Sequence, residues 1–563
     1  MLKSLELENF KAFGERVKIP FAPITLIFGE NSSGKSSILQ SLNLLKQTRE
    51  SREAGALLLP RTEQGISDLG SFQDLLFDHD LNRVLSIRID ISTPHNMRNR
   101  AIVEIYRTLF WRKDESKNKS DNERKPLKEI GVELKFKRPS LEKEVFLDSI
   151  NIFAGELSEC VARFQHTNEI PTTIRQEVLP YLAREHRIYK NSNLKFVKCV
   201  WISNEQKYWV SRFEACREKK DSILQFLLEL KEKQFDGQIT LFDYFDEELP
   251  EEFSTKNKKD TLDDAIDFYS KDFSLKEFID RMQGQQLETY LALDGFLPYT
   301  SVRNREKILP EGHHPDFRRI YSGNPLSLDS GILANMFGRV VGQTLEIFFP
   351  LGPFRRPPER WYIFTGTSPQ DVGYKGELLP DLLFRRPELV EEANSWLDRL
   401  DIGYHLKVQP LGERTKDLFE VQLIDTRRKP SVEVGLPDVG FGISQLLPFI
   451  VQSLSSKEKI ISIEQPEVHI HPRLQADLGN LLAETIKPPR NNQFIIETHS
   501  EHLVLRLQKL VSLKELSPND VSILYVSRGA NGSKVQQLQL DEDGDFIDDW
   551  PGGFFPERLR ELR

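Results

Sequence analysis

Cysteine is scarce in this chain, and long apolar runs are missing from it. Its 563 residues include three cysteines, Cys160, Cys199 and Cys216, whose odd number and spacing match neither paired zinc ligands nor a disulfide framework. We interpret them as free thiols in a reducing compartment and expect a cytoplasmic protein. No apolar run is long enough to span a bilayer, and the start MLKSLELENFKAF alternates polar with apolar residues as a strand does. We therefore expect neither a membrane partner nor a signal peptide.

An excess of basic residues is also lacking. The chain has 77 Lys and Arg against 86 Asp and Glu, for a net charge of -9. Any contact with DNA must therefore come from a local patch. The candidate patches are the cluster Arg355, Arg356 and Arg360 and the loop residues Lys117, Lys119, Arg124 and Lys125. A solvated face explains both groups more readily than a nucleic-acid interface does.

The pattern of predicted elements divides the chain into three segments. In residues 1–153, alternating runs at Val84–Ile91, Ala101–Tyr106, Gly131–Phe136 and Val145–Phe153 predict a small antiparallel sheet. Residues 154–329 change to short amphipathic helices without a lasting heptad repeat, which predicts a mostly helical inserted domain. Residues 330–563 alternate apolar strands with helices, an α/β pattern. We expect the two ends of the chain to build one α/β head around the insertion.

The strongest motif is the glycine-rich stretch Gly29-Glu30-Asn31-Ser32-Ser33-Gly34-Lys35-Ser36, followed by Ser37. It fits the pattern G-x-x-x-x-G-K-[ST] and lies between an apolar strand (Ile24–Phe28) and a helical pattern. In this context the backbone N–H groups of such a loop bind the phosphates of ATP. Lys35 would pair with the β and γ phosphates, and the Ser36 hydroxyl would be a ligand of Mg²⁺. A flexible Gly/Ser turn is the weaker alternative.

Two further strands end in polar residues. The run Lys459–Ile463 leads into Glu464-Gln465-Pro466-Glu467, and a carboxylate at the end of a buried strand is costly unless it meets a cation. We interpret Glu464 as the acid on the magnesium side, with an exposed acidic turn as the alternative. The second strand, Gln493–Ile496, leads into Glu497-Thr498-His499-Ser500. His499 could contact a γ-phosphate, although one histidine alone is weak evidence.

A second anion-binding element is predicted in residues 438–454. Gly440, Gly442 and Ser444 precede the apolar helix Leu446–Leu454, and glycines at a helix N-terminus favour binding of an anion. One chain would then own two phosphate-binding loops. If one ATP needs both, they come from different subunits, which implies a head-to-tail homodimer with nucleotide between the subunits.

These motifs, in this order, resemble ABC-type ATPases of the RecF, SMC and OLD-like branch. The segment ENFKAF is similar to the N-terminal strand of that branch, GFGISQLLPF to its signature, IEQPEVHIHP to its Walker B and D-loop, and ETHSEHL to its switch. The resemblance implies an α/β ABC-type P-loop ATPase that uses ATP and Mg²⁺. It also implies that Ser444 reaches the γ-phosphate held by the other subunit and that His499 is the switch. Lys11 is placed among the nucleotide-binding residues, and Gln73 is the candidate Q-loop glutamine and metal ligand, although Ser71–Asp74 could equally begin a helix.

One residue departs from the family pattern. A second carboxylate usually follows the Walker B acid and polarises the attacking water, and here Gln465 stands in that place. An amide orients water but does not take its proton at neutral pH. Three interpretations follow: hydrolysis is slow and ATP acts as a dimer clamp; Glu467 substitutes as the base; or the glutamine was engineered to trap the ATP state. We favour slow, gated hydrolysis.

Other segments are similar to an OLD-like subgroup found in anti-phage defence operons: PLGPFRRPPERW, Asp371–Glu377 and Trp550–Phe555. OLD nucleases carry a TOPRIM domain after the head, whereas only residues 500–563 follow His499 here, and we interpret the acidic stretch at 541–545 as a turn. We expect an ATP-hydrolysing defence subunit that controls a separate effector such as a nuclease, as in Septu-type systems. The alternatives are a RecF/SMC-like repair or chromosome-maintenance ATPase that binds DNA itself and a scaffold that barely hydrolyses ATP.

Overall fold

The computed structural model describes two compact units of the chain. Described are residues 1–51, 57–62, 66–92, 129–140, 144–154, 160–167, 196–202, 262–278, 290–294, 296–299, 325–364, 368–412 and 417–551, with single positions at 213, 217, 220, 221, 224, 225, 228 and 366. Unit 1 comprises Met1–Ser92, Gly131–Asp148 and Val340–Arg563, and unit 2 comprises Thr93–Ile130 and Ser149–Arg339. Both ends of the chain therefore belong to one unit, as the sequence predicted. The predicted boundaries at 153/154 and 329/330 stay a prediction.

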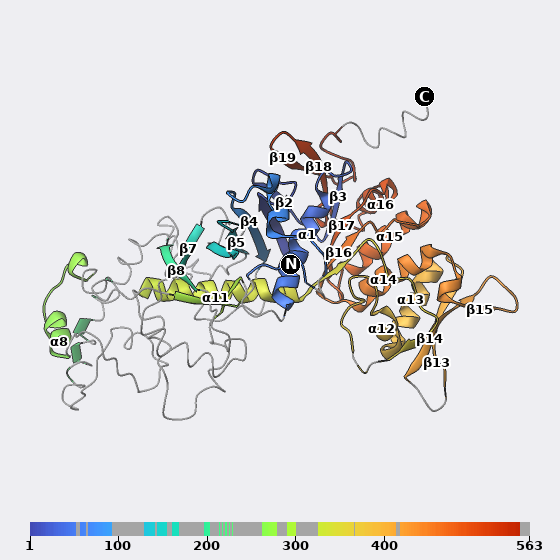
Figure 1. Cartoon of the computed structure of the whole chain (residues 1–563), viewed down its shortest axis with the longest axis horizontal. Coiled ribbons are helices and arrows are strands. Elements are labelled where there is room, and N and C mark those ends of the chain that lie inside the picture. The colour runs from blue at the N-terminus through green and yellow to red at the C-terminus, as the bar shows by residue number, and fades with distance from the viewer. Residues whose placement is uncertain are drawn as a thin grey trace. The chain divides into compact units, whose positions relative to one another are not determined.

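A six-stranded sheet is the centre of unit 1 (Figure 1). Its order is β11 (Phe348–Leu351), β16 (Ile460–Glu464), β17 (Gln493–Glu497), β3 (Ile24–Gly29), β18 (Val521–Gly529) and β19 (Gly532–Leu538). The first five strands are parallel, and β19 returns antiparallel to β18. All residues of β16 and β17 are buried, as expected for parallel strands covered on both faces. Because these strands are parallel, the carboxyl ends of β3, β16 and β17 meet at one edge.

The strand order explains which predicted motifs lie close together. β17 pairs directly with β3, and β16 lies beyond β17. In this register Glu464 is opposite Glu497, and Glu497 is opposite Ile27. The predicted strands Ile24–Phe28, Lys459–Ile463 and Gln493–Ile496 are thereby confirmed. Ligand sites of parallel sheets lie at this edge.

Helices cover the parallel sheet and complete one core. They are α1 (Lys35–Glu50), α12 (Leu379–Arg385), α13 (Pro387–Arg399), α14 (Phe441–Ser455), α15 (Pro472–Thr485) and α16 (Glu501–Ser512). α1 packs on β3 and β17, while α14, α15 and α16, drawn in orange to red, lie beside β16 and β17 in Figure 1. Their apolar side chains share one buried cluster with the sheet, including Ile463, Phe494 and Phe449. A small sheet of β12 (Tyr362–Ile363), β14 (Leu418–Asp425), β13 (Tyr404–Pro410) and β15 (Val432–Gly435) joins this cluster through Phe419.

Unit 1 also contains antiparallel strands. They are β2 (Val17–Pro20), β1 (Leu2–Glu8), β4 (Leu85–Ser92) and most of β5 (Glu129–Lys137), in that order, and β6 (Phe146–Ala154) begins here. The short elements α2 (Phe72–Leu75) and η1 (Phe77–His79) precede β4. The Gln493 side chain accepts from Leu2 N at 2.9 Å and donates to Leu2 O at 2.8 Å, which ties β1 to β17. This confirms the predicted α/β head with an antiparallel β subdomain.

Unit 2 contains strands as well as helices. Strands β7 (Cys160–Thr167), β8 (Phe196–Ile202), β9 (Tyr290–Asp294) and β10 (Leu297–Tyr299) pair in sequence order, each antiparallel to the next. The described helices are α8 (Leu262–Ser270) and the first part of α11 (Pro325–Glu346). Alternating runs such as β8 thus form strands within residues 154–329, and the prediction that this segment is mostly helical stays a prediction.

Several predicted features lie outside the described residues. These are the strand predicted at 101–106 and the loop residues Lys117, Lys119, Arg124 and Lys125. The described part of the chain contains no helix that is both long and apolar enough to cross a membrane. The remaining short helices are η5 (Leu436–Asp438) and η6 (Pro518–Asp520).

Candidate functional site

The glycine-rich loop (residues 29–36) connects β3 to α1 with a backbone that few residue types adopt. Gly29, Ser32 and Gly34 have φ of 144°, 58° and 97°. A Cβ on Gly29 would lie 2.0 Å from the carbonyl oxygen of Val526, and one on Gly34 would lie 2.7 Å from the Cβ of Ala12. Neither position has room for a side chain, and α1 begins at Lys35 with the free N–H groups of a helix N-terminus. This is the geometry that favours an oxyanion.

The C-terminal hairpin braces this loop. Ser533 Oγ donates to the carbonyl of Ser33 at 2.6 Å, and Arg528 donates from Nε to Ser32 O at 3.3 Å and from Nη2 to Asn31 O at 3.2 Å. Arg528 lies on β18 and Ser533 on β19. The sequence analysis did not identify either residue, because nothing local in the chain links them to a loop about five hundred positions away.

Lys35 and Ser36 are held at the mouth of the loop. Lys35 Nζ donates to Gly29 O at 3.0 Å and to Glu30 O at 2.7 Å, and burial lowers the pKa of this amine. Ser36 Oγ donates to Glu497 Oε1 at 3.0 Å. Glu497 is 4% exposed, yet its Oε2, like the buried Ser33 Oγ, has no hydrogen-bond partner among the described residues. Buried polar atoms without partners fit a site that takes up a polar ligand.

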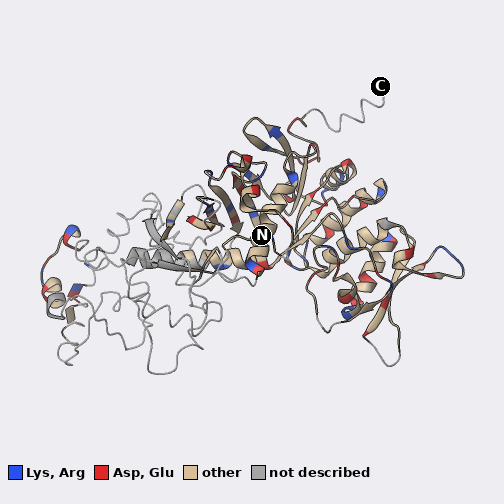
Figure 2. Cartoon of the chain, in the orientation of Figure 1, with Lys and Arg blue, Asp and Glu red and all other residues tan. Residues whose placement is uncertain are grey.

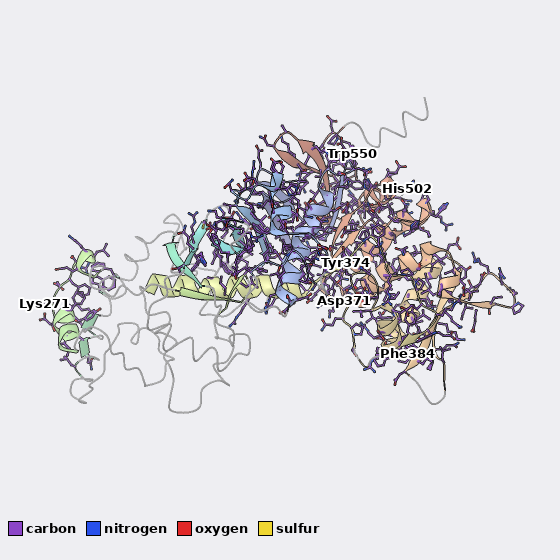
Figure 3. All side chains as sticks on the ribbon, in the orientation of Figure 1. Lys271, Asp371, Tyr374, Phe384, His502 and Trp550 are labelled. Carbon is purple, nitrogen blue, oxygen red and sulfur yellow. The ribbon has the colours of Figure 1, made fainter. Side chains whose placement is uncertain are left out.

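Glu464 ends β16 in a different setting from Glu497. It is 9% exposed and accepts a hydrogen bond from Tyr374 Oη at 3.0 Å, a residue labelled in Figure 3. Burial, and then the charge of Glu497, raises the pKa of Glu464 to about 7. Arg355 lies close enough to lower that pKa, and burial in turn lowers the pKa of Arg355 to about 10. The segments containing Tyr374 and Arg355 thus contribute to the site rather than to the surface.

The predicted basic cluster for DNA is corrected by these contacts. Arg355 is 6% exposed, and its Nε and Nη2 have no hydrogen-bond partner among the described residues. Arg360 donates to both carboxylate oxygens of Asp438 at 2.8 and 2.9 Å, and Arg356 is paired with Glu359. Figure 2 shows basic and acidic positions interspersed over unit 1. The second candidate group, Lys117 to Lys125, lies outside the described residues.

Gln465 and Glu467 lie in the turn after β16. Gln465 has a φ of 46° and donates its N–H to Glu497 O at 2.8 Å. Glu467 accepts from Thr498 Oγ1 at 2.7 Å and from the His499 N–H at 2.6 Å. Burial raises the pKa of Glu467, while these two hydrogen bonds oppose the rise. Glu467 therefore holds the backbone of the switch segment in place.

His499 follows β17 and its side chain is exposed. Partial burial of the ring, and then the charge of Lys35, lowers the pKa of His499. The influence of Lys35 places His499 on the side of the glycine-rich loop. The structure thus brings Lys35, Ser36, Glu464, Glu467 and His499 to one edge of the sheet, with Glu497 as the residue that the sequence analysis did not select.

The predicted signature begins α14. A Cβ on Gly442 would lie 2.8 Å from the carbonyl oxygen of His469, so this helix start packs against the turn after β16. Gly440 is exposed, whereas Ser444, one turn further on, is buried, with 8% of its surface exposed. The exposed part of the segment is therefore its glycine end, and Ser444 itself is mostly covered within its own chain.

Gln73 lies in α2, and Lys11 lies in the turn after β1, whose backbone is bonded to the last residue of α2. Gln73 donates from Nε2 to His79 O at 3.1 Å, and the Lys11 N–H donates to Leu75 O at 2.7 Å. Burial lowers the pKa of Lys11, and Asp74 opposes that shift. The described interactions of the Gln73 amide thus stay within α2 and η1, and its metal and Q-loop roles remain predictions.

The residues at the sheet edge fit a magnesium nucleotide. Mg²⁺ prefers oxygen ligands and is commonly bound through one or two protein oxygens together with phosphates and water. The Ser36 hydroxyl and the carboxylates of Glu464 and Glu497 are such oxygens. Among the residues that the structure describes, no group of three or more His, Cys, Asp or Glu is arranged to hold a metal ion by itself.

One comparison with known proteins, with family models, shows the family of the chain. A family model described as AAA ATPase domain matches residues 1–309 and 388–504, and one described as a protein of unknown function (DUF3696) matches residues 516–563. A search of curated proteins finds no match. The second model covers the hairpin that braces the glycine-rich loop.

Among solved structures, the chain is similar to head domains of Smc proteins. The Smc head domain with an extended coiled coil bound to the C-terminal domain of ScpA, from Pyrococcus furiosus, is 12% identical, with 100% of this chain and 99% of that chain covered and a TM-score of 0.37. The SMC head domain from Thermotoga maritima is 12% identical, with 96% and 99% covered and a TM-score of 0.32. The Smc head domain with a coiled coil and joint from Pyrococcus yayanosii is 13% identical, with 100% and 99% covered and a TM-score of 0.36. At these scores the matches add nothing to the assignment.

Proposed function

Since the chain belongs to the AAA ATPase domain family, we propose that it binds ATP with Mg²⁺ at the glycine-rich loop and hydrolyses it slowly. The observation that carries this proposal is the joint placement of Lys35, Ser36 and two buried carboxylates at the edge where β3, β16 and β17 end. The unpartnered oxygens of Ser33 and Glu497 support a polar ligand there.

Each residue has a role that follows from its position. Lys35 exchanges its bonds to the loop carbonyls for bonds to the β and γ phosphates, and the loop N–H groups hold the remaining phosphate oxygens. Ser36 offers its hydroxyl oxygen to Mg²⁺, which when bound neutralises phosphate charge. His499 lies where it can sense the γ-phosphate, its backbone held by Glu467. Gln465 orients water without taking its proton, which makes turnover slow.

The binding proposal is tested by Lys35→Ala. Titration with a fluorescent ATP analogue should show at least about a tenfold loss of affinity, because a charge-assisted contact worth about 1.5–3 kcal/mol is removed. Lys407→Ala is the matched control, since Lys407 is paired with Glu433 on the small sheet far along the chain. Equal affinity of Lys35→Ala and the parent chain would end the proposal.

Slow hydrolysis is tested by Gln465→Glu. Restoring a carboxylate beside Glu464 should raise the rate of phosphate release about a hundredfold, the low end of what a general base contributes. Glu467→Gln distinguishes the alternative, because a loss of turnover in that variant alone would assign the base to Glu467. An unchanged rate in Gln465→Glu would contradict the proposal that the missing carboxylate limits turnover.

We also propose that ATP joins two copies into an ABC-type homodimer. The exposed glycine end of α14, at Gly440, is the surface that would meet nucleotide on the second copy. Sedimentation of the ATP-bound chain should give a dimer that Gly440→Trp abolishes while nucleotide affinity is kept. A monomer at saturating ATP would contradict this proposal.

The resemblance to OLD-like and Septu-type ATPases supports a finer proposal, that dimer closure controls a separate effector, such as a nuclease, in anti-phage defence. Cells carrying the chain with its neighbouring genes should resist phage, and Lys35→Ala should remove that resistance. Direct DNA binding is less favoured now that Arg355 is buried and Arg360 is paired. Salt-sensitive DNA affinity that rises with ATP would restore that alternative.

A further inference from the structure

Three carboxylates lie at the carboxyl ends of β16 and β17: Glu464 and Glu497 end these strands, and Glu467 lies in the turn after β16. We call them the edge carboxylates. They differ in distance along the sheet from β3. Adjacent strands lie about 4.8 Å apart, and β17 is adjacent to β3 whereas β16 is one strand further away. The backbone of Glu497 is therefore one strand spacing closer to the loop than that of Glu464.

Glu497 makes direct contact with the loop. Ser36 Oγ donates its hydroxyl hydrogen to Glu497 Oε1 at 3.0 Å. A serine hydroxyl has one hydrogen and two lone pairs, so a carboxylate that accepts the hydrogen leaves the lone pairs for a cation. A second partner that fixes the orientation of a metal ligand in this way is a recurrent feature of metal sites.

A second, independent observation concerns the other oxygen of Glu497. The side chain is 4% exposed, and Oε2 has no hydrogen-bond partner among the described residues. A buried carboxylate oxygen without a donor costs free energy unless a ligand or water reaches it. The nearby charge of Lys35 acts on this carboxylate, so the group lies within the field of the loop.

The other edge carboxylates have different partners. Glu464 accepts from Tyr374 and faces Arg355, and Glu467 has one oxygen bonded to Thr498 and the other to the His499 N–H. Among the described contacts, neither Glu464 nor Glu467 meets Ser36 or Lys35. Of the three, Glu497 is the one whose observed contacts point into the loop.

From these contacts we propose that Glu497, and not Glu464, is the carboxylate that orients the Ser36 hydroxyl for Mg²⁺ and so makes nucleotide binding depend on magnesium. This inference rests on the proposed nucleotide site. Glu497 is a positioning residue that acts through Ser36. Glu464, the Walker B acid predicted from the sequence, accepts its described hydrogen bond from Tyr374 instead.

The test measures binding of a fluorescent ATP analogue to the full chain with Mg²⁺ and with EDTA. Glu497→Gln keeps the shape of the side chain and removes its charge, so affinity in EDTA should stay within about twofold of the parent while the gain due to Mg²⁺ falls at least about tenfold. Affinity in EDTA serves as the check that the variant is folded, with Glu497→Asp as a second variant if it is not.

Matched variants locate the effect. Ser36→Ala should lose the same Mg²⁺ gain, and the double variant should lose little more, because both act on one interaction. Glu464→Gln should reduce the gain less than Glu497→Gln does, because the described hydrogen bond of Glu464 is with Tyr374 and not with Ser36. Glu433→Gln, in the exposed pair with Lys407, is the control that should leave the gain unchanged. A full Mg²⁺ gain in Glu497→Gln, or its loss in Glu464→Gln instead, would overturn the assignment. A parent chain that binds no nucleotide with or without Mg²⁺ would overturn the proposed function itself.

Discussion

Two groups of charged side chains in unit 1 differ in how their charges are paired. On the antiparallel strands, Arg16 is bonded to Glu6, Glu8 and Glu133, and Glu133 also accepts from Ser86 Oγ at 2.9 Å. At the end of the parallel strands, the edge carboxylates have Arg355 and Lys35 nearby, but neither cation is within ion-pair distance of them in any described contact. The first group is satisfied by the chain itself, and the second is not.

The difference separates a structural cluster from a site. Buried charges that are fully paired hold strands in register, while unpaired ones persist only when something else uses them. The raised pKa of Glu464, about 7, results from burial and from Glu497, which means that the folded chain tolerates a proton there until a cation arrives. The same residue type therefore has opposite roles in the two groups.

The largest change in unfolding free energy is expected when Arg16 loses one of its carboxylate partners. Glu133→Gln removes a carboxylate that is 2% exposed and leaves Arg16 with one strong partner fewer, which should cost about 3 kcal/mol of unfolding free energy. The figure is at the low end of the range because 39% of the Arg16 side chain is exposed and screened by solvent. Denaturant unfolding measures it, with Glu433→Gln, in an exposed pair, expected to cost less than about 1 kcal/mol. Equal losses would remove the distinction.

Neutralising an edge carboxylate should raise the free energy of unfolding instead of lowering it. The pKa of Glu464 is raised from 4.5 to about 7, so its protonated form stabilises the fold, and this contribution is present at low pH and lost as pH rises from about 4.5 to about 7. Glu464→Gln is neutral throughout and should reduce this decline, leaving the variant about 2 kcal/mol more stable than the parent at pH 8. Thermal unfolding between pH 5 and pH 8 would check this, in the absence of nucleotide. A destabilised variant at pH 8 would contradict the comparison.

A smaller effect sharpens the role of the hairpin. Ser533→Ala removes one hydrogen bond to the glycine-rich loop and should cost about 1 kcal/mol, seen as a loss of nucleotide affinity of about fivefold. Ser527→Ala, on the neighbouring strand, is the control. If both variants bind nucleotide equally well, the hydrogen bond from Ser533 to the loop does not contribute to the shape of the loop.

Much of the fold followed from local pattern. The apolar runs that became β3, β16 and β17 were predicted from the pattern of neighbouring residues in the chain. The strands of unit 2 were missed, because short alternating runs between charged clusters also fit short helices. The candidate basic cluster failed at Arg355 for a related reason, since an arginine in a proline-rich stretch beside a second arginine gives no local sign of burial.

By itself, the sequence determined the glycine-rich loop and its lysine and serine, because that motif needs only a backbone conformation which eight consecutive residues encode. Tertiary structure alone decided which carboxylate meets Ser36. Glu497 is 461 positions from Ser36, and it reaches that serine because β17, rather than β16, is hydrogen-bonded to β3. Strand order depends on how all the elements pack together, and no short stretch of residues carries that information.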